Sequence, residues 1–339
     1  MFQVFSKQSA VEPVSNQPTL ERHESKSGVP KIGLALSGGA ARGWAHIGVI
    51  KALTANGLMP DVIAGTSIGA LVGGVWAAGK LPELEEWVRA INKRRILGLM
   101  DFRFGGAGLI AGGRLADLLV KNLGDMKIED LPVRFAAIAT ELGTGHEIWL
   151  TQGSLSDAMR ASYALPGIFN PVKVAGRWLM DGALVNPVPV TAARALGARL
   201  VIAVNLNADM FGRGTVIQNH GLEEEPDPDP DAVTVELTRE TRIGSMFRID
   251  RLIRRQFFGD RAHDGPSGIS AVMVDAFNIT QDRISRSRLA GDPPDVLLSP
   301  KLGNIGLFDF GNAAQAIKLG EEAVERGLEE IHEATAALT

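Results

Sequence analysis

The sequence contains no cysteine, which excludes disulfide bridges, thiolate metal sites and cysteine nucleophiles. It also has no excess of positive charge: 35 lysines and arginines face 39 aspartates and glutamates. This balance argues against a nucleic-acid partner bound through bulk charge. No apolar run is long enough for a membrane span, because glycines, Thr66 and Ser67 interrupt the most apolar stretch, residues 62–78.

The composition that remains is typical of a globular protein with a large core. Of the 339 residues, 45% are apolar and 22% are charged, which excludes wholesale disorder. Residues 1–30 are mostly polar and lack the apolar segment of a signal peptide, so they predict a flexible tail. We therefore expect a cytoplasmic protein with one domain over residues 31–339.

The order of apolar and glycine-rich segments predicts an α/β domain with a central, mostly parallel sheet. Apolar runs at residues 32–36 and 61–64 each lead into a glycine-rich loop and a helix, as parallel strands buried on both faces do. Further strands are expected at residues 134–140, 147–151, 172–174, 178–180, 200–205 and 296–298. Helices are expected at residues 41–55, 81–95, 114–123, 154–163 and 190–196, and from residue 311 onward, with a glycine-rich loop at 105–113.

The composition changes over residues 207–268, which we interpret as an insertion. Residues 223–231 are acidic and broken by prolines, and predict a solvated loop. Residues 236–258 predict a basic amphipathic helix suited to peripheral contact with an anionic membrane. The alternative is a surface helix whose arginine stems cover the core. The α/β pattern then resumes at residues 269–274, followed by a helix to about residue 289.

Ser67 is the candidate nucleophile. It lies in a Gly65-x-Ser67-x-Gly69 motif between an apolar strand and an apolar helix. Glycine on each side permits the sharp turn of a nucleophile elbow, which projects the hydroxyl above the sheet. The helix that starts there also directs its amide groups toward a developing oxyanion. The alternative is a helix-capping serine in a tight turn.

A second glycine-rich loop follows the first strand and precedes a helix, so its N–H groups form a cradle for an anion. The backbone amides of Gly38, Gly39 and Ala40 are candidates to hold the oxyanion of an acyl transfer. A dinucleotide-binding loop is one alternative, but it requires an acidic residue at the end of the second strand, and Asp61 lies at that strand's beginning. The other alternative is that the glycines of this loop serve packing alone.

A serine hydroxyl needs a base. Among the six histidines, His146, in a loop after a strand, is the best candidate for a triad, whereas His46 lies one turn too deep in the helix after the glycine loop. Asp181 ends an apolar strand and is followed by Gly182, which allows close approach to another loop. Asp-Gly is also a common turn sequence, so the residues alone leave the base open.

Three motifs in a fixed order resemble the bacterial patatin-like phospholipases. They are residues 37–43 (SGGAARG), residues 65–69 (GTSIG) and residues 181–183 (DGA). Residues 160–169 and 186–189 are similar to the family's segments before and after the aspartate. The resemblance covers residues 31–205, and residues 294–322 resemble the tail of the bacterial group.

The resemblance implies a patatin-like three-layer fold and hydrolysis of a (phospho)lipid or other acyl ester. It implies a Ser67–Asp181 dyad without a catalytic histidine, and an oxyanion loop of Gly38, Gly39 and Ala40. Ala40 departs from the family, which has a glycine there, and so restricts the loop's backbone. The residues expected to support these loops are Arg42, Gly43, Gly65, Gly69 and Gly182, with Arg42 either anchoring the loop or meeting an anionic head group.

No cofactor is expected, and no metal site either, since no paired histidine and carboxylate spacing occurs near these loops. Calcium-independent hydrolysis is therefore expected. The alternative function is a regulatory or binding protein on the same fold, with weak or no hydrolase activity. Nothing in the sequence indicates an oligomeric state.

Overall fold

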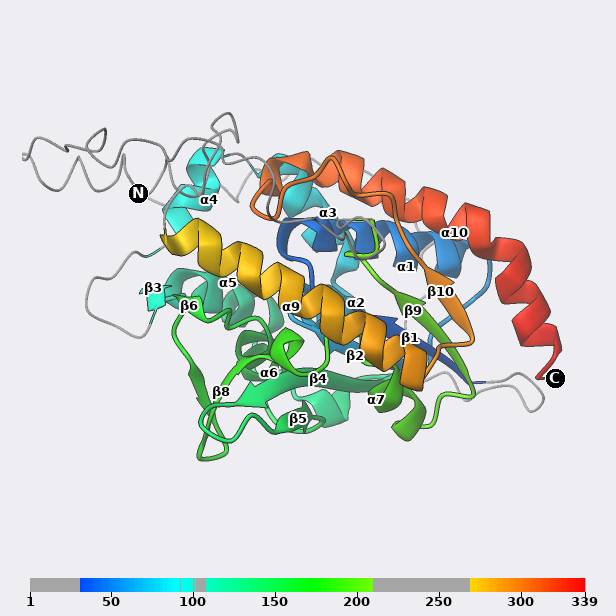
Figure 1. Ribbon diagram of the computed structural model, residues 1–339, viewed down its shortest axis with the longest axis horizontal. Helices are drawn as coiled ribbons and strands as arrows, with labels where there is room; N and C mark the ends of the chain where they lie inside the picture. Colours follow the sequence, from blue (N-terminus) through cyan, green and yellow to red (C-terminus); the bar gives the residue numbers. More distant parts are fainter. Residues whose placement is uncertain (1–30, 92, 100, 102–107, 210–268, 339) are drawn as a thin grey trace, which may run out of the picture.

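The computed structural model describes residues 31–91, 93–99, 101, 108–209 and 269–338. Within them, one eight-stranded sheet carries helices on both faces (Figure 1). Its strands are β1 (Ile32–Leu36), β2 (Val62–Thr66), β4 (Arg134–Glu141), β5 (Glu147–Leu150), β7 (Val172–Val174), β8 (Arg177–Asp181), β9 (Leu200–Val204) and β10 (Val296–Leu298). A separate pair is formed by β3 (Gly108–Ile110) and β6 (Gly167–Phe169).

The helices are mostly short. They are α1 (Ala45–Ala55), α2 (Ile68–Ala77), α3 (Leu81–Ala90), α4 (Lys93–Leu99), α5 (Gly113–Leu123), α6 (Leu155–Ser162), α7 (Val190–Ala195), α9 (Ile269–Gly291) and α10 (Ala313–Ala336). Four 3₁₀ turns connect described elements: η1 (Ala40–Trp44), η2 (Ile128–Asp130), η3 (Gly182–Leu184) and η5 (Phe310–Asn312).

The sheet is mostly parallel. Five strands run parallel in the order β10-β9-β1-β2-β4, as short strands buried on both faces predict. At the other end, β5 and β8 both pair antiparallel with β4, and β7 forms the expected hairpin with β8. The α/β class and the mostly parallel sheet expected from the sequence are confirmed.

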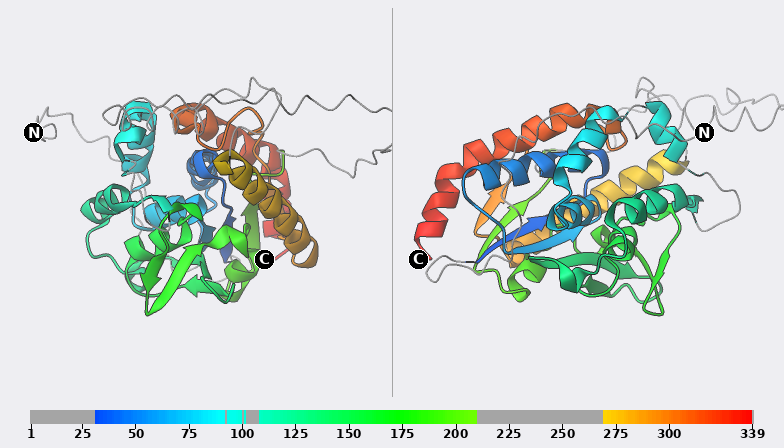
Figure 2. Two further views of the ribbon diagram at one scale, coloured as in Figure 1. Left: turned by 60° about the vertical axis from the view of Figure 1, so that its left-hand side comes forward. Right: turned by 180° about the vertical axis from the view of Figure 1, so that it is seen from behind.

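The two faces of the sheet carry side chains of different size, which explains the layers. Large side chains such as Leu34 and Phe135 face α1, α2 and α10. Alanines such as Ala35 and Ala136 face the opposite side, where α7 and Leu289 of α9 pack on them. Figure 2 shows these helices on the two sides of the sheet. Small side chains allow α7 to lie close against the strands.

The structure corrects several element boundaries. The expected helix 41–55 begins as the 3₁₀ turn η1, and the expected helix 81–95 divides into α3 and α4 because Ile91 is extended. The expected loop 105–113 contains β3. Residues 269–274 begin α9 rather than form an element of their own, because a short apolar run does not distinguish strand from helix.

Two expectations lie outside the described residues: the tail 1–30 and, from residue 210 on, the insertion with its acidic loop and the basic helix 236–258. Among the residues that are described, no helix combines the length and the apolar character needed to cross a bilayer.

Helices α1 and α10 lie side by side (Figure 1), and two glycines set their separation. A Cβ on Gly48 would lie 1.9 Å from the Ile317 carbonyl oxygen, and one on Gly320 would lie 2.0 Å from the Ala45 carbonyl oxygen. Both contacts are with backbone, which no change of rotamer relieves. The packing of α10 on the domain therefore requires glycine at both positions.

We expect Gly48→Ala to destabilise the protein by about 2 kcal/mol or more, the range of overpacked cores. Urea unfolding followed by tryptophan fluorescence measures it. The matched control is Gly98→Ala in α4, where an added Cβ meets nothing within 4 Å. Equal unfolding midpoints for the Gly48 variant and the wild type would contradict the steric argument.

Candidate active site

Ser67 occupies a strained turn between β2 and α2, at φ 56° and ψ −123°. Its two glycine neighbours are required by space. A Cβ on Gly65 would lie 2.5 Å from the Ala70 backbone, and one on Gly69 would lie 2.3 Å from the Leu36 carbonyl oxygen. The Ser67 side chain makes no capping hydrogen bond to α2, so the helix-capping alternative is wrong.

Strand β4 brings Asp181 to Ser67. Thr66 of β2 pairs with Ile138 of β4, and Asp181 of β8 pairs with the next β4 residue, Ala139. Because β5 occupies the other edge of β4, β2 and β8 lie on the same edge with their C-terminal ends facing. Ser67, which follows β2, and Asp181, which ends β8, therefore meet.

The Ser67 hydroxyl donates a hydrogen bond to Asp181, with Oγ and Oδ2 2.6 Å apart. The other carboxylate oxygen, Oδ1, accepts from the Ala183 N–H at 2.8 Å. Asp181 is only 2% exposed. Burial raises the pKa of this carboxyl to about 7, although the bonds from Ser67 and Ala183 act in the opposite direction. The carboxyl is thus hydrogen-bonded to the serine, and its raised pKa lies near neutral pH.

Ser162 also contacts the backbone of Ser67, although no motif marked it. Its Oγ accepts from the Ser67 N–H at 2.8 Å and donates to the Ile138 carbonyl at 2.6 Å. It therefore ties the elbow to β4. The only sequence signal was its place in the segment 160–169 that resembles the family.

The structure differs from the expected oxyanion loop at one residue, Gly38. The Gly38 N–H donates to the Pro187 carbonyl at 3.1 Å, so it is not available to an oxyanion in this conformation. Gly39 and Ala40 line the cavity beside Ser67. Among the described residues, neither of their N–H groups has an acceptor. Ala40 adopts φ 48°, the left-handed region that favours glycine, which is the residue the family has at this position.

Arg42 anchors this loop from behind. Its guanidinium is buried, and donates from Nε to the Ile305 carbonyl at 2.8 Å and from Nη1 to Asn207 Oδ1 at 3.3 Å. The following Gly43 has no room for a side chain, since a Cβ would lie 2.1 Å from Ile68. Of the two roles considered for Arg42, the structure supports the anchor.

The other candidates lie away from Ser67. His146 is largely exposed, with Nδ1 3.6 Å from Glu141. His46 is buried beneath the glycine loop, where its Nε2 lies 2.8 Å from the Ser37 carbonyl oxygen, and burial lowers its pKa to about 4. Asp61 accepts from the Ile32 N–H at the start of β1, the opposite end of the strands. Asp61 is therefore not placed to serve as the acidic residue that the dinucleotide-binding alternative requires.

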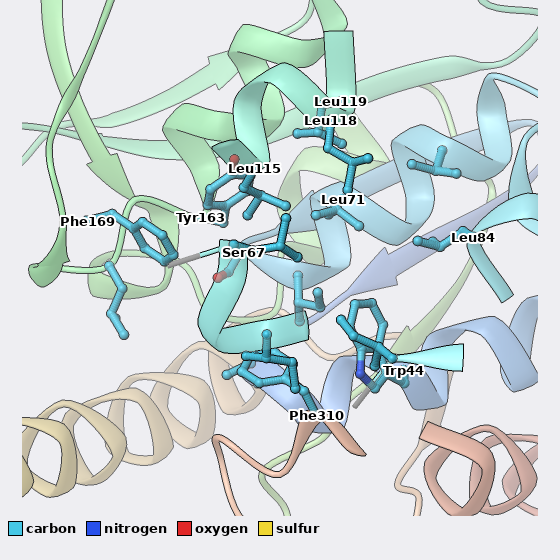
Figure 3. Close-up of a pocket in the computed structure, with 18 of the residues that line it drawn as sticks. Trp44, Ser67, Leu71, Leu84, Leu115, Leu118, Leu119, Tyr163, Phe169 and Phe310 are labelled. Atoms are coloured by element: carbon cyan, nitrogen blue, oxygen red, sulfur yellow. The ribbon is translucent and has the colours of Figure 1, made fainter. Parts of the chain in front are cut away.

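A cavity of about 290 Å³ opens beside Ser67 and Asp181. It follows one face of α2 through Ile68, Leu71 and Val75. Figure 3 shows leucines, Tyr163 and Phe169 around Ser67. Lys80 and Glu83, which form an ion pair, line it beyond the end of α2. Val75 lies eight residues after Ser67, which corresponds to about 12 Å along a helix, so the apolar wall is elongated.

A partly buried serine bonded to a buried carboxyl at a sharp strand-to-helix turn, beside an apolar cavity, is the arrangement expected of a serine hydrolase. Comparison with known proteins agrees with that class. Residues 34–194 match the family model described as patatin-like phospholipase. An uncharacterised NTE family protein of Mycobacterium tuberculosis is 32% identical over 89% of this chain and 92% of its own length.

The chain therefore belongs to the patatin-like phospholipase family. Neuropathy target esterase sws of Drosophila melanogaster is 33% identical over 52% of this chain and 13% of its own. Among solved structures, VipD of Legionella pneumophila superposes with a TM-score of 0.43 and 12% identity, over 88% of this chain and 67% of that chain.

The raised pKa of Asp181 predicts a pH-dependent stability. The folded-state pKa, about 7, lies above the usual 3.8, so the wild type loses stability as pH rises from about 4 to about 7. Asp181→Asn cannot titrate at this position. Relative to that variant, we expect the wild type to lose up to about 4 kcal/mol of its free energy of unfolding over this pH range. Urea unfolding of both proteins at a series of pH values measures the difference. A difference in the free energy of unfolding that stays constant with pH would show that the pKa of Asp181 is not raised.

Proposed function

We propose that this protein is a serine lipid acyl hydrolase that cleaves carboxylic esters of (phospho)lipids through a Ser67–Asp181 dyad. Family membership supports lipid acyl hydrolysis in general. The observation that carries the dyad is the 2.6 Å hydrogen bond from the Ser67 hydroxyl to a buried carboxyl with a raised pKa. That bond gives a weak nucleophile the base it needs.

In the first half of the proposed reaction, Ser67 Oγ attacks the ester carbonyl carbon while Asp181 accepts the hydroxyl proton. The carbonyl oxygen becomes an oxyanion, which we assign to the N–H groups of Gly39 and Ala40. Collapse of this intermediate expels the alcohol oxygen, which takes the proton back from Asp181. The product is an acyl group on Ser67.

In the second half, Asp181 accepts a proton from water, and the water oxygen attacks the acyl carbon. The same donors hold the second oxyanion. Its collapse releases the fatty acid, and the proton on Asp181 returns to Ser67 Oγ. The second Asp181 oxygen remains fixed by the Ala183 N–H, so the carboxyl keeps its orientation through both halves.

The cavity supports an acyl substrate. Its wall along α2 is apolar and begins at the serine, so an acyl chain attached to the reacting carbonyl would lie along that helix. Peripheral membrane contact through residues 236–258 stays a prediction, since those residues are not described. The regulatory alternative is disfavoured by the bonded Ser67–Asp181 pair, because a protein without activity would have no need of it.

We expect wild-type protein to release fatty acid from mixed phospholipid vesicles, and Ser67→Ala to release none. Asp181→Asn should reduce the rate about 10²- to 10⁴-fold, the contribution of a general base. Fatty acid is measured by a coupled assay. Ser156→Ala, a buried serine of α6 outside the cavity, is the control and should retain wild-type activity. Undiminished release by the Ser67 variant would refute the proposal.

The dyad also predicts how activity depends on pH. Only the ionised carboxylate accepts the serine proton, so kcat/KM should rise with pH through about 7 and then level off. A water-soluble acyl ester, with the acid released measured directly, gives this profile without a vesicle surface. Residual activity of Asp181→Asn should lack the inflection. An inflection near pH 4 in the wild type would mean that burial does not control this base.

A further inference from the structure

Helix α9 brings a glutamine into the cavity. Gln281 is 5% exposed and lines the cavity together with Ser67 and Asp181. It also lies close to the glycine loop: a Cβ placed on Gly38 would be 3.9 Å from Gln281 Oε1 and 3.4 Å from Ser67 Cβ. The amide of Gln281 and the nucleophile therefore stand beside the same residue of the loop.

Hydrogen bonds fix the orientation of this amide. Arg42 can only donate, so its bond to Asn207 makes Asn207 Oδ1 the acceptor. Asn207 Nδ2 then donates to the Gly38 carbonyl at 3.4 Å and to Gln281 Oε1 at 3.3 Å. Gln281 is thereby held with its oxygen toward Asn207 and its NH₂ group turned away from it.

The NH₂ group of Gln281 has no acceptor among the described residues. Because Gln281 lines the cavity, its two N–H groups can donate to a group that enters this space. Phe277, which lines the cavity one turn before Gln281 on α9, is apolar and supplies no acceptor. A group that enters the cavity with an exposed oxygen would satisfy it.

We propose that Gln281 Nε2 is a donor to the ester carbonyl oxygen as it becomes an oxyanion, beside the N–H groups of Gly39 and Ala40. This inference rests on the proposed hydrolase function. The Gly38 N–H is committed to Pro187, so the loop leaves room for a donor from another element. A side-chain amide can serve in this role, and the loss of one such donor lowers kcat by about 10²- to 10³-fold.

The test compares Gln281→Met with the wild type on a water-soluble acyl ester. We expect kcat to fall by about 10²-fold or more and KM to change by less than about threefold, because the bond forms in the transition state. Gln281→Asn, which withdraws the amide by one methylene and keeps it polar, should also lose kcat. Ser285→Ala is the control: its Oγ is buried one turn further along α9, lies outside the cavity and has no partner among the described residues.

A second readout separates this inference from the function on which it rests. An alkyl fluorophosphonate reacts when Ser67 Oγ bonds to phosphorus, fluoride leaves, and Asp181 accepts the proton. The wild type should be labelled, Ser67→Ala should not be, and both Gln281 variants should be labelled more slowly. Wild-type labelling with unchanged kcat in both Gln281 variants, or a loss confined to KM, would overturn the role of Gln281. Absence of labelling in the folded wild type would overturn the hydrolase and this inference with it.

Discussion

The site depends on one interaction, the hydrogen bond between Ser67 and a carboxyl that the fold has removed from water. A free aspartate is too weak a base to accept a serine proton efficiently near neutral pH. Burial of Asp181 compensates, because it raises the pKa of the carboxyl to about 7. A histidine has a pKa near neutral pH by its own chemistry, and Asp181 reaches one because it is buried. The proposed dyad therefore has a physical basis without a third residue.

The glycines of the motifs follow from how closely the chain must pass itself to build this bond. Gly69 lies against the carbonyl at the end of β1, and a Cβ on Gly182 would lie 2.2 Å from the Ile138 carbonyl oxygen. These contacts keep the ends of β2 and β8 at a distance at which Ser67 and Asp181 share a proton. The small residues of the motifs are therefore the ones that allow the chain to pass itself closely enough for this bond.

The sequence predicts the strand-loop-helix units well, because each is encoded locally by an apolar run and its glycines. It does not predict that β8 pairs antiparallel with β4, since residues 139 and 181 are joined only by tertiary structure. The choice of Asp181 over His146 therefore came from the family resemblance. The engagement of the Gly38 N–H by Pro187 and the arrival of Gln281 from α9 have no local signal, because both depend on segments distant in sequence.

In the proposed mechanism, the apolar cavity links the selection of the substrate to the pKa of Asp181. Ser67, Ile68 and Asp181 line the same cavity. The α2 side chains that would contact an acyl chain therefore also help to limit the access of water to Asp181. A bound chain would remove further water and favour the uncharged states of that carboxyl. The initial proton acceptance would then depend on the oxyanion donors to balance the charge. Under the proposed mechanism, the apolar wall and the Gly39–Ala40 loop are therefore coupled parts of one electrostatic arrangement.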